Sequence, residues 1–397
     1  MKPIDLRVKT RFIKKYHQHF PLISKDSISN PEVLKQEGAI VHLTEPSGKF
    51  IAKGYHGKQN KGLGWVLTHQ QGEKIDFIFF KKKITTAMER RNSLFQDINT
   101  NAFRLFNGEG DGIGGLTIDY FDGFYLINWY SEGIYSFKDT VIRVLDEVAD
   151  YKAIYEKKRF DTKGKYMDDD DFVKGERGEF PIIVKENGIN YAVYLNDGAM
   201  VGIFLDQRNV RKAIRDKYAK GKHVLNTFSY TGAFSVAAAL GGATKTTSVD
   251  LAKRSKSKTI EQFSVNGIDF EAQDIIVMDV FDYFRYALRK NLKFDMVILD
   301  PPSFARSKKR TFSTAKDYPS LIKDTIAITE KSGIIVASTN NASFGMKKFK
   351  GFIEKGFQET KTKYQILEEY SLPTDFRVDQ SYPQGDYLKV IILKKLN

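Results

Sequence analysis

Residues 224–234 read Val224-Leu225-Asn226-Thr227-Phe228-Ser229-Tyr230-Thr231-Gly232-Ala233-Phe234. An apolar run of strand length enters a polar turn and then an alanine-rich helix that ends at Gly241-Gly242. The same alternation continues toward the end of the chain, with strands expected at 223–227, 246–249, 274–278, 295–299, 333–337 and 387–393. Such alternation is typical of a doubly wound α/β domain with a parallel sheet, which we expect over residues 188–397.

On a sheet of this kind, ligands bind beyond the carboxyl ends of the strands. The turn after the first strand contains a single glycine, Gly232. A dinucleotide pyrophosphate needs close backbone approach at several glycines, whereas S-adenosylmethionine, which has no phosphate, needs only one. The loop therefore favours the methyl donor over NAD.

Acidic residues end the next strands. Asp250 follows Gly232 by 18 residues, close to the spacing of a carboxylate that binds ribose hydroxyls. Asp279 is expected near the adenine amino group, with Val280 and Phe281 against the ring. A helix cap would explain any one acid alone, but three acids in order, with Asp300 as the third, favour a binding site.

The fourth strand ends in Asp300-Pro301-Pro302-Ser303-Phe304. The two prolines lack N–H groups and hold the carbonyls of Asp300 and Pro301 rigidly outward. A stiff strand exit is the alternative, but such a turn can also bind a planar base on which Phe304 stacks. The basic run 306–310 comes directly afterwards, and we expect it to contact RNA phosphates.

Length and charge predict a multidomain protein with a polyanionic partner. The chain has 397 residues and a formal charge of +14, from 63 Lys and Arg against 49 Asp and Glu. Residues 1–64 hold 12 Lys and Arg against 5 Asp and Glu and read as short strands separated by turns. We expect a β-rich, phosphate-binding domain at 1–74 and a small α+β domain at 75–187.

The glycine-rich stretch 108–115 imitates a dinucleotide loop, but Leu116-Thr117-Ile118 reads as a strand. A hairpin is therefore predicted there, because no helix N-terminus follows to bind a pyrophosphate.

Cysteine is absent from the sequence, which excludes disulfides, thiolate metal sites and catalysis through an enzyme sulfur. The six histidines show no metal-ligand pairing, so no metal is expected.

No apolar stretch suits a signal peptide or a membrane helix, so a cytoplasmic location without membrane contact is expected.

The whole chain resembles the RlmI-like family of class I S-adenosylmethionine-dependent ribosomal RNA methyltransferases. The matching motifs are Phe204-Leu205-Asp206-Gln207-Arg208, the 226–232 loop, Ser248-Val249-Asp250, Asp279-Val280-Phe281 and the run from Asp300 to Lys308. The resemblance implies an N-terminal PUA-like RNA-binding domain, a small central domain, a Rossmann-like methyltransferase domain and large-subunit ribosomal RNA as partner. The motifs and the resemblance together predict a cofactor site made of Phe204, Asp206, Arg208, Asn226, Phe228, Ser229, Tyr230, Thr231, Gly232, Asp250, Leu251, Asp279, Val280, Phe281 and Asp300.

The sequence departs from that family at one place. Methylation of cytosine carbon 5 in RlmI-type enzymes resembles other pyrimidine methylations in needing a thiolate, expected just after the strand that ends at Ala337. Here the sequence continues Ser338-Thr339-Asn340-Asn341. A hydroxyl without an activating histidine cannot replace a thiolate at neutral pH, so the thiolate mechanism is excluded.

Nitrogen and oxygen acceptors remain. Ring nitrogen 7 of guanine has a lone pair outside the π system, so transfer needs only in-line positioning. The C-terminal half is also similar to the RlmK methyltransferase domain, which forms 7-methylguanosine in large-subunit RNA. That product is our prediction, followed by an exocyclic base amine. A non-catalytic RNA-binding protein with a retained donor pocket and an NAD oxidoreductase are the rivals.

The expected reaction site lies on the strand ends. The catalytic residues predicted are Asp300, Pro301 and Asn340, and the predicted substrate-binding residues are Pro302, Phe304, Arg306, Lys308 and Asn341. The oligomeric state, a homodimer included, is left open.

Overall fold

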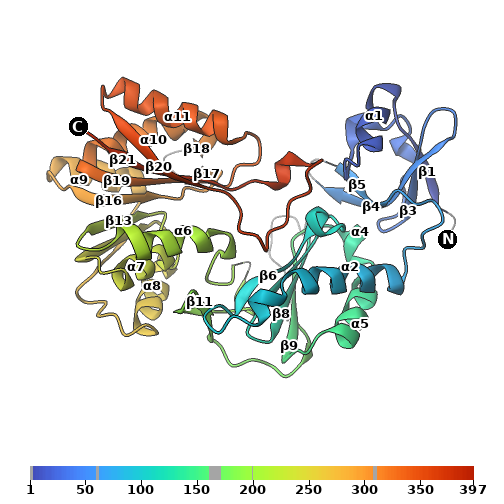
Figure 1. Ribbon diagram of the computed structural model, residues 1–397, viewed down its shortest axis with the longest axis horizontal. Helices are drawn as coiled ribbons and strands as arrows, with labels where there is room; N and C mark the ends of the chain where they lie inside the picture. Colours follow the sequence, from blue (N-terminus) through green and yellow to red (C-terminus); the bar gives the residue numbers. More distant parts are fainter. Residues whose placement is uncertain (1–2, 60–61, 161–170, 199, 307–310) are drawn as a thin grey trace. The chain divides into compact units, whose positions relative to one another are not determined.

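The computed structural model describes residues 3–59, 62–160, 171–198, 200–306 and 311–397 (Figure 1). The chain divides into two compact units. Unit 1 contains residues 1–184, 194–201 and 374–385, and unit 2 contains residues 185–193, 202–373 and 386–397. No helix among the described residues is long and apolar enough to cross a membrane.

Unit 1 begins with a five-stranded sheet in the order β1-β3-β4-β5-β2. Its elements are β1 (Ile4–Arg7), α1 (Ile13–His17), β2 (Leu22–Ser24), β3 (Ile40–Thr44), β4 (Phe50–Gln59) and β5 (Gly62–Thr68). A tight turn joins β3 to β4, because Gly48 donates to the Glu45 carbonyl and adopts a left-handed φ of 90°. The β-rich N-terminal segment expected from the sequence is confirmed.

The second sheet of unit 1 has the order β10-β9-β8-β7-β6. Its elements and flanking helices are α2 (Phe77–Arg90), α3 (Asn92–Phe95), β6 (Ala102–Asn107), β7 (Leu116–Phe121), β8 (Phe124–Trp129), α4 (Glu132–Tyr135), α5 (Lys138–Val148), β9 (Ala153–Lys158) and β10 (Phe172–Gly175). The stretch 108–115 joins the antiparallel strands β6 and β7 through one 3₁₀ turn. The predicted hairpin is therefore confirmed.

The two sheets of unit 1 share one hydrophobic core. Tyr55 of β4 is fully buried, packs edge-on against Phe137 and donates its hydroxyl to the Gly114 carbonyl at 2.7 Å. Apolar side chains that precede residue 74 in the sequence and apolar side chains that follow it are thus buried in the same core. The division into domains at 1–74, 75–187 and 188–397 stays a prediction.

Unit 2 is built on a seven-stranded sheet in the order β15-β14-β13-β16-β19-β21-β20. The strands are β13 (His223–Thr227), β14 (Lys245–Asp250), β15 (Asp274–Val277), β16 (Phe294–Leu299), β19 (Thr329–Thr339), β20 (Tyr364–Tyr370) and β21 (Lys389–Lys395). The first five are parallel, and β21 runs antiparallel to both β19 and β20. The doubly wound fold expected from the sequence is confirmed.

Helices cover both faces of this sheet, with α9, α10 and α11 on one side and α6, α7 and α8 on the other (Figure 1). Their bounds are α6 (Arg208–Ala213), continued by a π-helical turn (Ile214–Tyr218), α7 (Ala233–Leu240), α8 (Arg254–Ser264), α9 (Val280–Arg289), α10 (Thr314–Ile328) and α11 (Met346–Glu359). Short strands β11 (Ile182–Glu186) and β12 (Ile189–Val193) precede them, and β17 (Phe304–Arg306) pairs with β18 (Thr311–Ser313).

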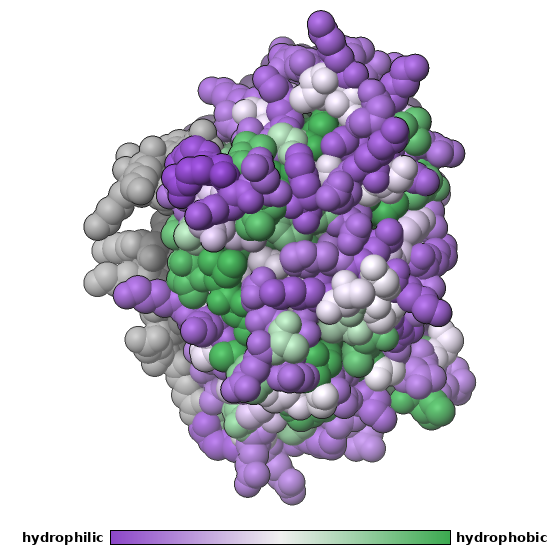
Figure 2. All heavy atoms as spheres, turned by 90° about the vertical axis from the view of Figure 1, so that its left-hand side faces the viewer, coloured by the Kyte–Doolittle hydropathy of each residue, from purple (hydrophilic) through white to green (hydrophobic). Residues whose placement is uncertain are grey.

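Because both faces are covered, β16 and β19 contain continuous buried apolar runs, at residues 296–299 and 334–337, and Leu225 of β13 is fully buried. Strand β20 lies at the edge and is mostly half-exposed, so its sequence Tyr-Gln-Ile-Leu-Glu-Glu-Tyr lacks that signal and was not predicted. Figure 2 shows hydrophilic residues over most of one face, with hydrophobic patches between them. The strand order reverses between β13 and β16, which marks the carboxyl ends of these strands as the binding edge.

Candidate active site

The loop between β13 and α7 is held in an unusual backbone conformation. Phe228 and Tyr230 have φ angles of 54° and 52°, a left-handed region that residues with a β-carbon seldom adopt. Gly232 has φ 80°, and a β-carbon there would lie 2.5 Å from Cγ2 of Thr259 on α8. Neither the backbone angle nor the space accepts a side chain, which explains why the loop's single glycine stands at this position.

Asp250, at the end of β14, holds this loop in place. Its Oδ2 accepts the backbone N–H of Tyr230 at 2.9 Å, and its Oδ1 accepts that of Ala252 at 2.8 Å. Ser229 also donates its backbone N–H to the Val249 carbonyl. The structure therefore places Asp250 at the loop, where it braces the backbone, a role that spacing alone could not reveal. Its contact with ribose stays a prediction.

The segment before α6 packs against the same loop. Tyr230 accepts the backbone N–H of Gly202 through its hydroxyl at 3.0 Å, and Thr231 donates its hydroxyl to the Gly202 carbonyl at 2.6 Å. Phe204, with 44% of its surface exposed, lies 5.3 Å from the Tyr230 ring between centroids. Asp206 accepts the Tyr387 hydroxyl at 2.9 Å. Predicted residues from two distant segments thus meet, and Arg208, which begins α6, is buried beside them.

Asp300 follows β16 and belongs to a three-residue hydrogen-bond network. Its Oδ1 accepts the Ser338 hydroxyl at 2.8 Å and the Gln207 amide at 3.2 Å, and Gln207 also donates to the Ser338 hydroxyl at 2.9 Å. Desolvation raises the pKa of Asp300 to about 6, while the hydrogen bond from Ser338 opposes that rise. Gln207 and Ser338 were not predicted as site residues, although Gln207 stands between Asp206 and Arg208 in a quoted motif.

Two residues predicted to bind the cofactor have side chains that turn into the protein, so their predicted role stays a prediction that only their backbone groups could fulfil. Asn226 is 1% exposed, and its amide donates to the Ser235 hydroxyl at 2.9 Å, so its side chain links β13 to α7 inside the domain. Val280 is 3% exposed and packs in the core. Both positions lie beside the site in sequence, but the alternation of faces directs these side chains into the protein.

Asp279 caps α9, since its Oδ1 accepts the backbone N–H groups of Phe281 and Asp282. Asp279 therefore acts as a helix cap, the alternative given above for a single acid. A contact with the adenine amino group would be a second role of the same side chain. Phe281 lies 6.2 Å from Phe228 and 5.7 Å from Phe312 between ring centroids. Leu251, beside Asp250, is exposed.

The acceptor side is formed by the Asp300-Pro301-Pro302 turn and the end of β19. Pro301 is buried and Pro302 is exposed, and Ser303 donates its hydroxyl to Oδ1 of Asn340 at 2.6 Å. Phe304 is 63% exposed, as a stacking surface requires. The Ser303–Asn340 bond joins the turn to the chain after β19, so two predicted elements of the site meet.

The remaining predicted substrate contacts stay predictions. The Asn341 carboxamide oxygen accepts both the backbone N–H and the hydroxyl of Ser343 in a local turn. The backbone of Arg306 lies in β17, and Lys308 lies outside the described residues.

A doubly wound sheet whose binding edge combines a one-glycine loop, strand-end acids and a rigid Asp-Pro-Pro turn defines a methyltransferase that uses a nucleoside-type donor. The chain belongs to the S-adenosylmethionine-dependent methyltransferase family, which matches residues 103–381. A PUA-like domain matches residues 6–69. S-adenosylmethionine is therefore the methyl donor of this enzyme. That the loop, Asp250 and Asp206 bind it stays a prediction.

Relatives match the chain over nearly its whole length. A Bacillus subtilis protein, YwbD, assigned as a ribosomal RNA large subunit methyltransferase, is 64% identical over 98% of this chain and 99% of its own. Ribosomal RNA large subunit methyltransferase I of Aeromonas salmonicida is 28% identical over 94% and 95%. A crystal structure of SMU.776, described as a methyltransferase complexed with SAH, has a TM-score of 0.91 and 40% identity and covers 98% of this chain and 100% of that one.

Proposed function

We propose that the protein methylates large-subunit ribosomal RNA at ring nitrogen 7 of a guanine, without a covalent enzyme–RNA intermediate. The observation that carries the proposal is the absence of cysteine from the whole sequence, which excludes thiolate-dependent methylation of pyrimidine carbon 5 and leaves acceptors such as guanine nitrogen 7 that need only positioning. The names of the relatives from Bacillus subtilis and Aeromonas salmonicida support the substrate class. The net charge of +14 and the PUA-like domain support an RNA partner. The cytoplasmic location and a homodimer stay predictions.

The proposed reaction requires the protein to position the methyl donor and the base and to stabilise the charge that develops on the base. S-adenosylmethionine supplies an electrophilic methyl group on a sulfonium. The guanine gains a methyl group and a positive charge at nitrogen 7, and no proton has to leave. The Ser229–Gly232 loop and Asp250 hold the donor side, and the Asp300 turn with Ser303 and Asn340 holds the base. An ionised Asp300 stabilises the charge that develops on the ring.

A second acceptor, an exocyclic amine of adenine or guanine, is favoured by one observation. The pKa of Asp300, raised by desolvation to about 6, suits a carboxylate that receives a proton. An amine must lose a proton when it is methylated, and the carbonyls of Asp300 and Pro301 could orient it.

Nucleoside analysis of large-subunit RNA decides between these acceptors. RNA from cells with and without the protein would be digested and compared by mass spectrometry, and purified enzyme would be tested on the unmodified RNA. We expect 7-methylguanosine at one position, revealed also by aniline cleavage after mild reduction. An N-methylated amine would select the second acceptor, and 5-methylcytosine would overturn the argument from cysteine.

A further inference from the structure

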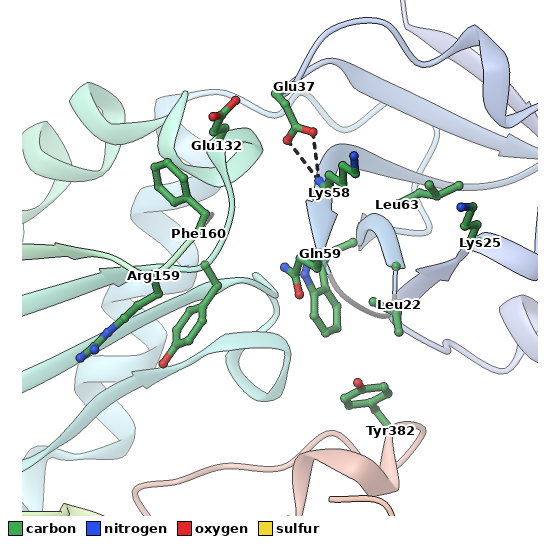
Figure 3. Close-up of a pocket in the computed structure, with 13 residues that line it drawn as sticks. Leu22, Lys25, Glu37, Lys58, Gln59, Leu63, Glu132, Arg159, Phe160 and Tyr382 are labelled. Carbon is green, nitrogen blue, oxygen red and sulfur yellow. Dashed lines mark hydrogen bonds between the residues drawn. The ribbon is translucent and has the colours of Figure 1, made fainter. Parts of the chain in front are cut away.

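A cavity of about 820 Å³ lies beside β4 and β5 in unit 1 (Figure 3). Among its lining residues, Arg159 turns its guanidinium to Asn128 and donates to it at 3.0 Å. The Phe160 ring packs on Tyr135, at 5.7 Å between the ring centroids. Both groups are thus engaged by the protein itself. A side chain with an open hydrogen-bonding group lies instead in unit 2, directly after β19.

This side chain belongs to Asn340, which lies beside the turn that begins at Asp300. Its Oδ1 accepts the Ser303 hydroxyl at 2.6 Å. Two residues earlier, Ser338 donates its hydroxyl to Asp300 at 2.8 Å. These two bonds join the turn to the end of β19. Because Ser338 is buried and Asn340 is exposed, Asn340 is the residue of the two that RNA can reach.

The bond from Ser303 decides which end of the Asn340 carboxamide faces a ligand. A carboxamide has one oxygen that accepts hydrogen bonds and one NH₂ group that donates them. Ser303 occupies the oxygen, and within the described part of the chain no acceptor is bonded to Nδ2. Ser303 is held in turn, since its carbonyl accepts the backbone N–H of Thr314 at 3.2 Å. Asn340 therefore presents an oriented donor where the base is expected.

The adjoining turn contributes hydrogen-bond acceptors. Pro301 and Pro302 have no N–H group, so their peptide units offer only carbonyl oxygens. Phe304, two residues further along the chain, is 63% exposed and supplies a flat surface. A base in this place meets acceptors from the turn, the ring of Phe304 and the donor of Asn340.

The orientation of Asn340 differs from the one that reads adenine. An asparagine commonly binds adenine by accepting the amino group at carbon 6 and donating to nitrogen 7. Here Ser303 occupies the oxygen, and a donor on nitrogen 7 would cover the lone pair that has to attack the methyl group. The other acceptor on this edge of a purine is oxygen 6 of guanine, which adjoins nitrogen 7.

From this geometry we propose that Nδ2 of Asn340 donates a hydrogen bond to oxygen 6 of the target guanine and thereby selects guanine over adenine. Adenine would bring the N–H groups of its amine against the N–H groups of Asn340. The N–H groups on nitrogens 1 and 2 of guanine suit the carbonyls of the turn. This inference rests on the proposed function, because it takes guanine nitrogen 7 as the methyl acceptor.

Base analogues test the proposal. A synthetic RNA fragment that contains the mapped guanine would carry guanine, 2-aminopurine or 2,6-diaminopurine at that position, and all three bases keep nitrogen 7. At carbon 6, 2-aminopurine has only a hydrogen atom, whereas 2,6-diaminopurine has an amino group. Transfer of a labelled methyl group gives kcat/KM for each base. Because the ratio between two bases is taken within one variant, a loss of overall activity cancels.

The Asn340 variants should change these ratios in different ways. Asn340→Ala should lower the ratio of guanine to 2-aminopurine about tenfold, the effect of one lost hydrogen bond. Asn340→Asp puts an acceptor in place of the donor at nearly the same size, so it should shift the preference from guanine toward 2,6-diaminopurine.

Two further variants test the role of the Ser303 bond. Ser303→Ala frees Oδ1 and lets the carboxamide turn over, so it should weaken the rejection of 2,6-diaminopurine. Gln358→Ala removes another exposed amide, one that is bonded to Glu354 on α11, and should keep every ratio of the parent.

The outcomes separate this inference from the proposed function. Unchanged ratios in both Asn340→Ala and Asn340→Asp would overturn the role of Asn340, even if the parent enzyme forms 7-methylguanosine. Ratios that change equally in Gln358→Ala would also overturn it. If nucleoside analysis of the parent's product shows a methylated adenine amine instead of 7-methylguanosine, the proposed function fails and the inference fails with it.

Discussion

Ser338 of β19 donates its hydroxyl to Oδ1 of Asp300, 2.8 Å away at the end of the neighbouring strand β16. Ser338 comes directly after Ala337. In the thiolate enzymes that this chain resembles, the catalytic cysteine is expected just after this point of the strand. The strand continues to Thr339, so Ser338 lies within it rather than after it. The Ser338 hydroxyl is therefore engaged by the carboxylate of Asp300.

Asp300→Asn should lower kcat by at least about 100-fold, the usual loss when one group that stabilises transition-state charge is removed. In the parent enzyme, kcat should rise with pH through an inflection near pH 6 and level off above it, because the ionised carboxylate is the active form. Methyl transfer from labelled donor to RNA, measured between pH 5 and pH 8, checks both. A flat profile in the parent would contradict this role.

Ser338→Ala should move that inflection above pH 6. The Ser338 hydrogen bond favours the ionised form of Asp300, so its loss raises the pKa of the carboxyl. Gln207→Ala should act in the same direction, and Gln207→Glu should lower transfer further by placing a like charge beside Asp300. An unshifted pH profile in Ser338→Ala would show that the hydroxyl does not influence the acid.

Asp300→Asn should also change how stability depends on pH. The folded-state pKa of about 6 lies above the ordinary 3.8, so the stability from this acid is fully present below pH 3.8 and is lost as pH rises through 6. The stability of Asp300→Asn relative to the parent should therefore improve by up to about 3 kcal/mol from pH 4 to pH 7. Urea unfolding at several pH values measures it, and a pH-independent difference would refute the raised pKa.

Asp250→Ala should weaken S-adenosylmethionine binding by about 10- to 100-fold, since charge-assisted hydrogen bonds contribute roughly 1.5 to 3 kcal/mol. The loss has two sources, the carboxylate contacts to the donor and the brace on the Tyr230 backbone. Isothermal titration calorimetry measures the affinity, with Glu271→Gln, an exposed acid on the same unit, as control. If the variant binds S-adenosylmethionine as tightly as the parent, Asp250 does not belong to the donor site.

Gly232→Ala should destabilise the protein by about 1–3 kcal/mol, because an L residue is strained at φ 80° and its β-carbon meets Cγ2 of Thr259. Thr259→Ser removes that methyl group, so the double variant should recover part of the loss and leave the backbone strain. Thermal unfolding of the two single variants and the double variant gives the coupling. Additive effects would show that the two side chains do not clash.

RNA binding should weaken steeply with salt, and replacing Arg11, Lys14 and Lys49 with Gln should flatten the slope. All three are exposed on the N-terminal segment, and each lost phosphate contact lowers the slope of log K against log salt by about 0.7. Deleting residues 1–64 is a poor test, because it removes much of the core shared within unit 1. An unchanged slope in the triple variant would place the phosphate contacts elsewhere.

Local sequence signals predicted β13, β14, β15, β16, β19 and β21 of the seven-stranded sheet. Most of these strands contain a short apolar run, and helices and turns separate them. Such a pattern is a property of neighbouring residues. The edge strand β20 escaped prediction because it is half-exposed and carries Glu368 and Glu369. The positions of Gly232, Asp250 and Asp300 at strand ends followed from the same local pattern.

By itself, the sequence determined the doubly wound fold, the one-glycine loop and the chemistry excluded by the absence of cysteine. Only the tertiary structure decided that Asn226 and Val280 turn inward, that Asp279 caps a helix, and that Gln207 and Ser338 meet Asp300. Gln207 lies 93 residues from Asp300 and 131 from Ser338. Periodicity and spacing record interactions between neighbours in the chain, whereas burial and hydrogen-bond partners depend on which distant segments pack together.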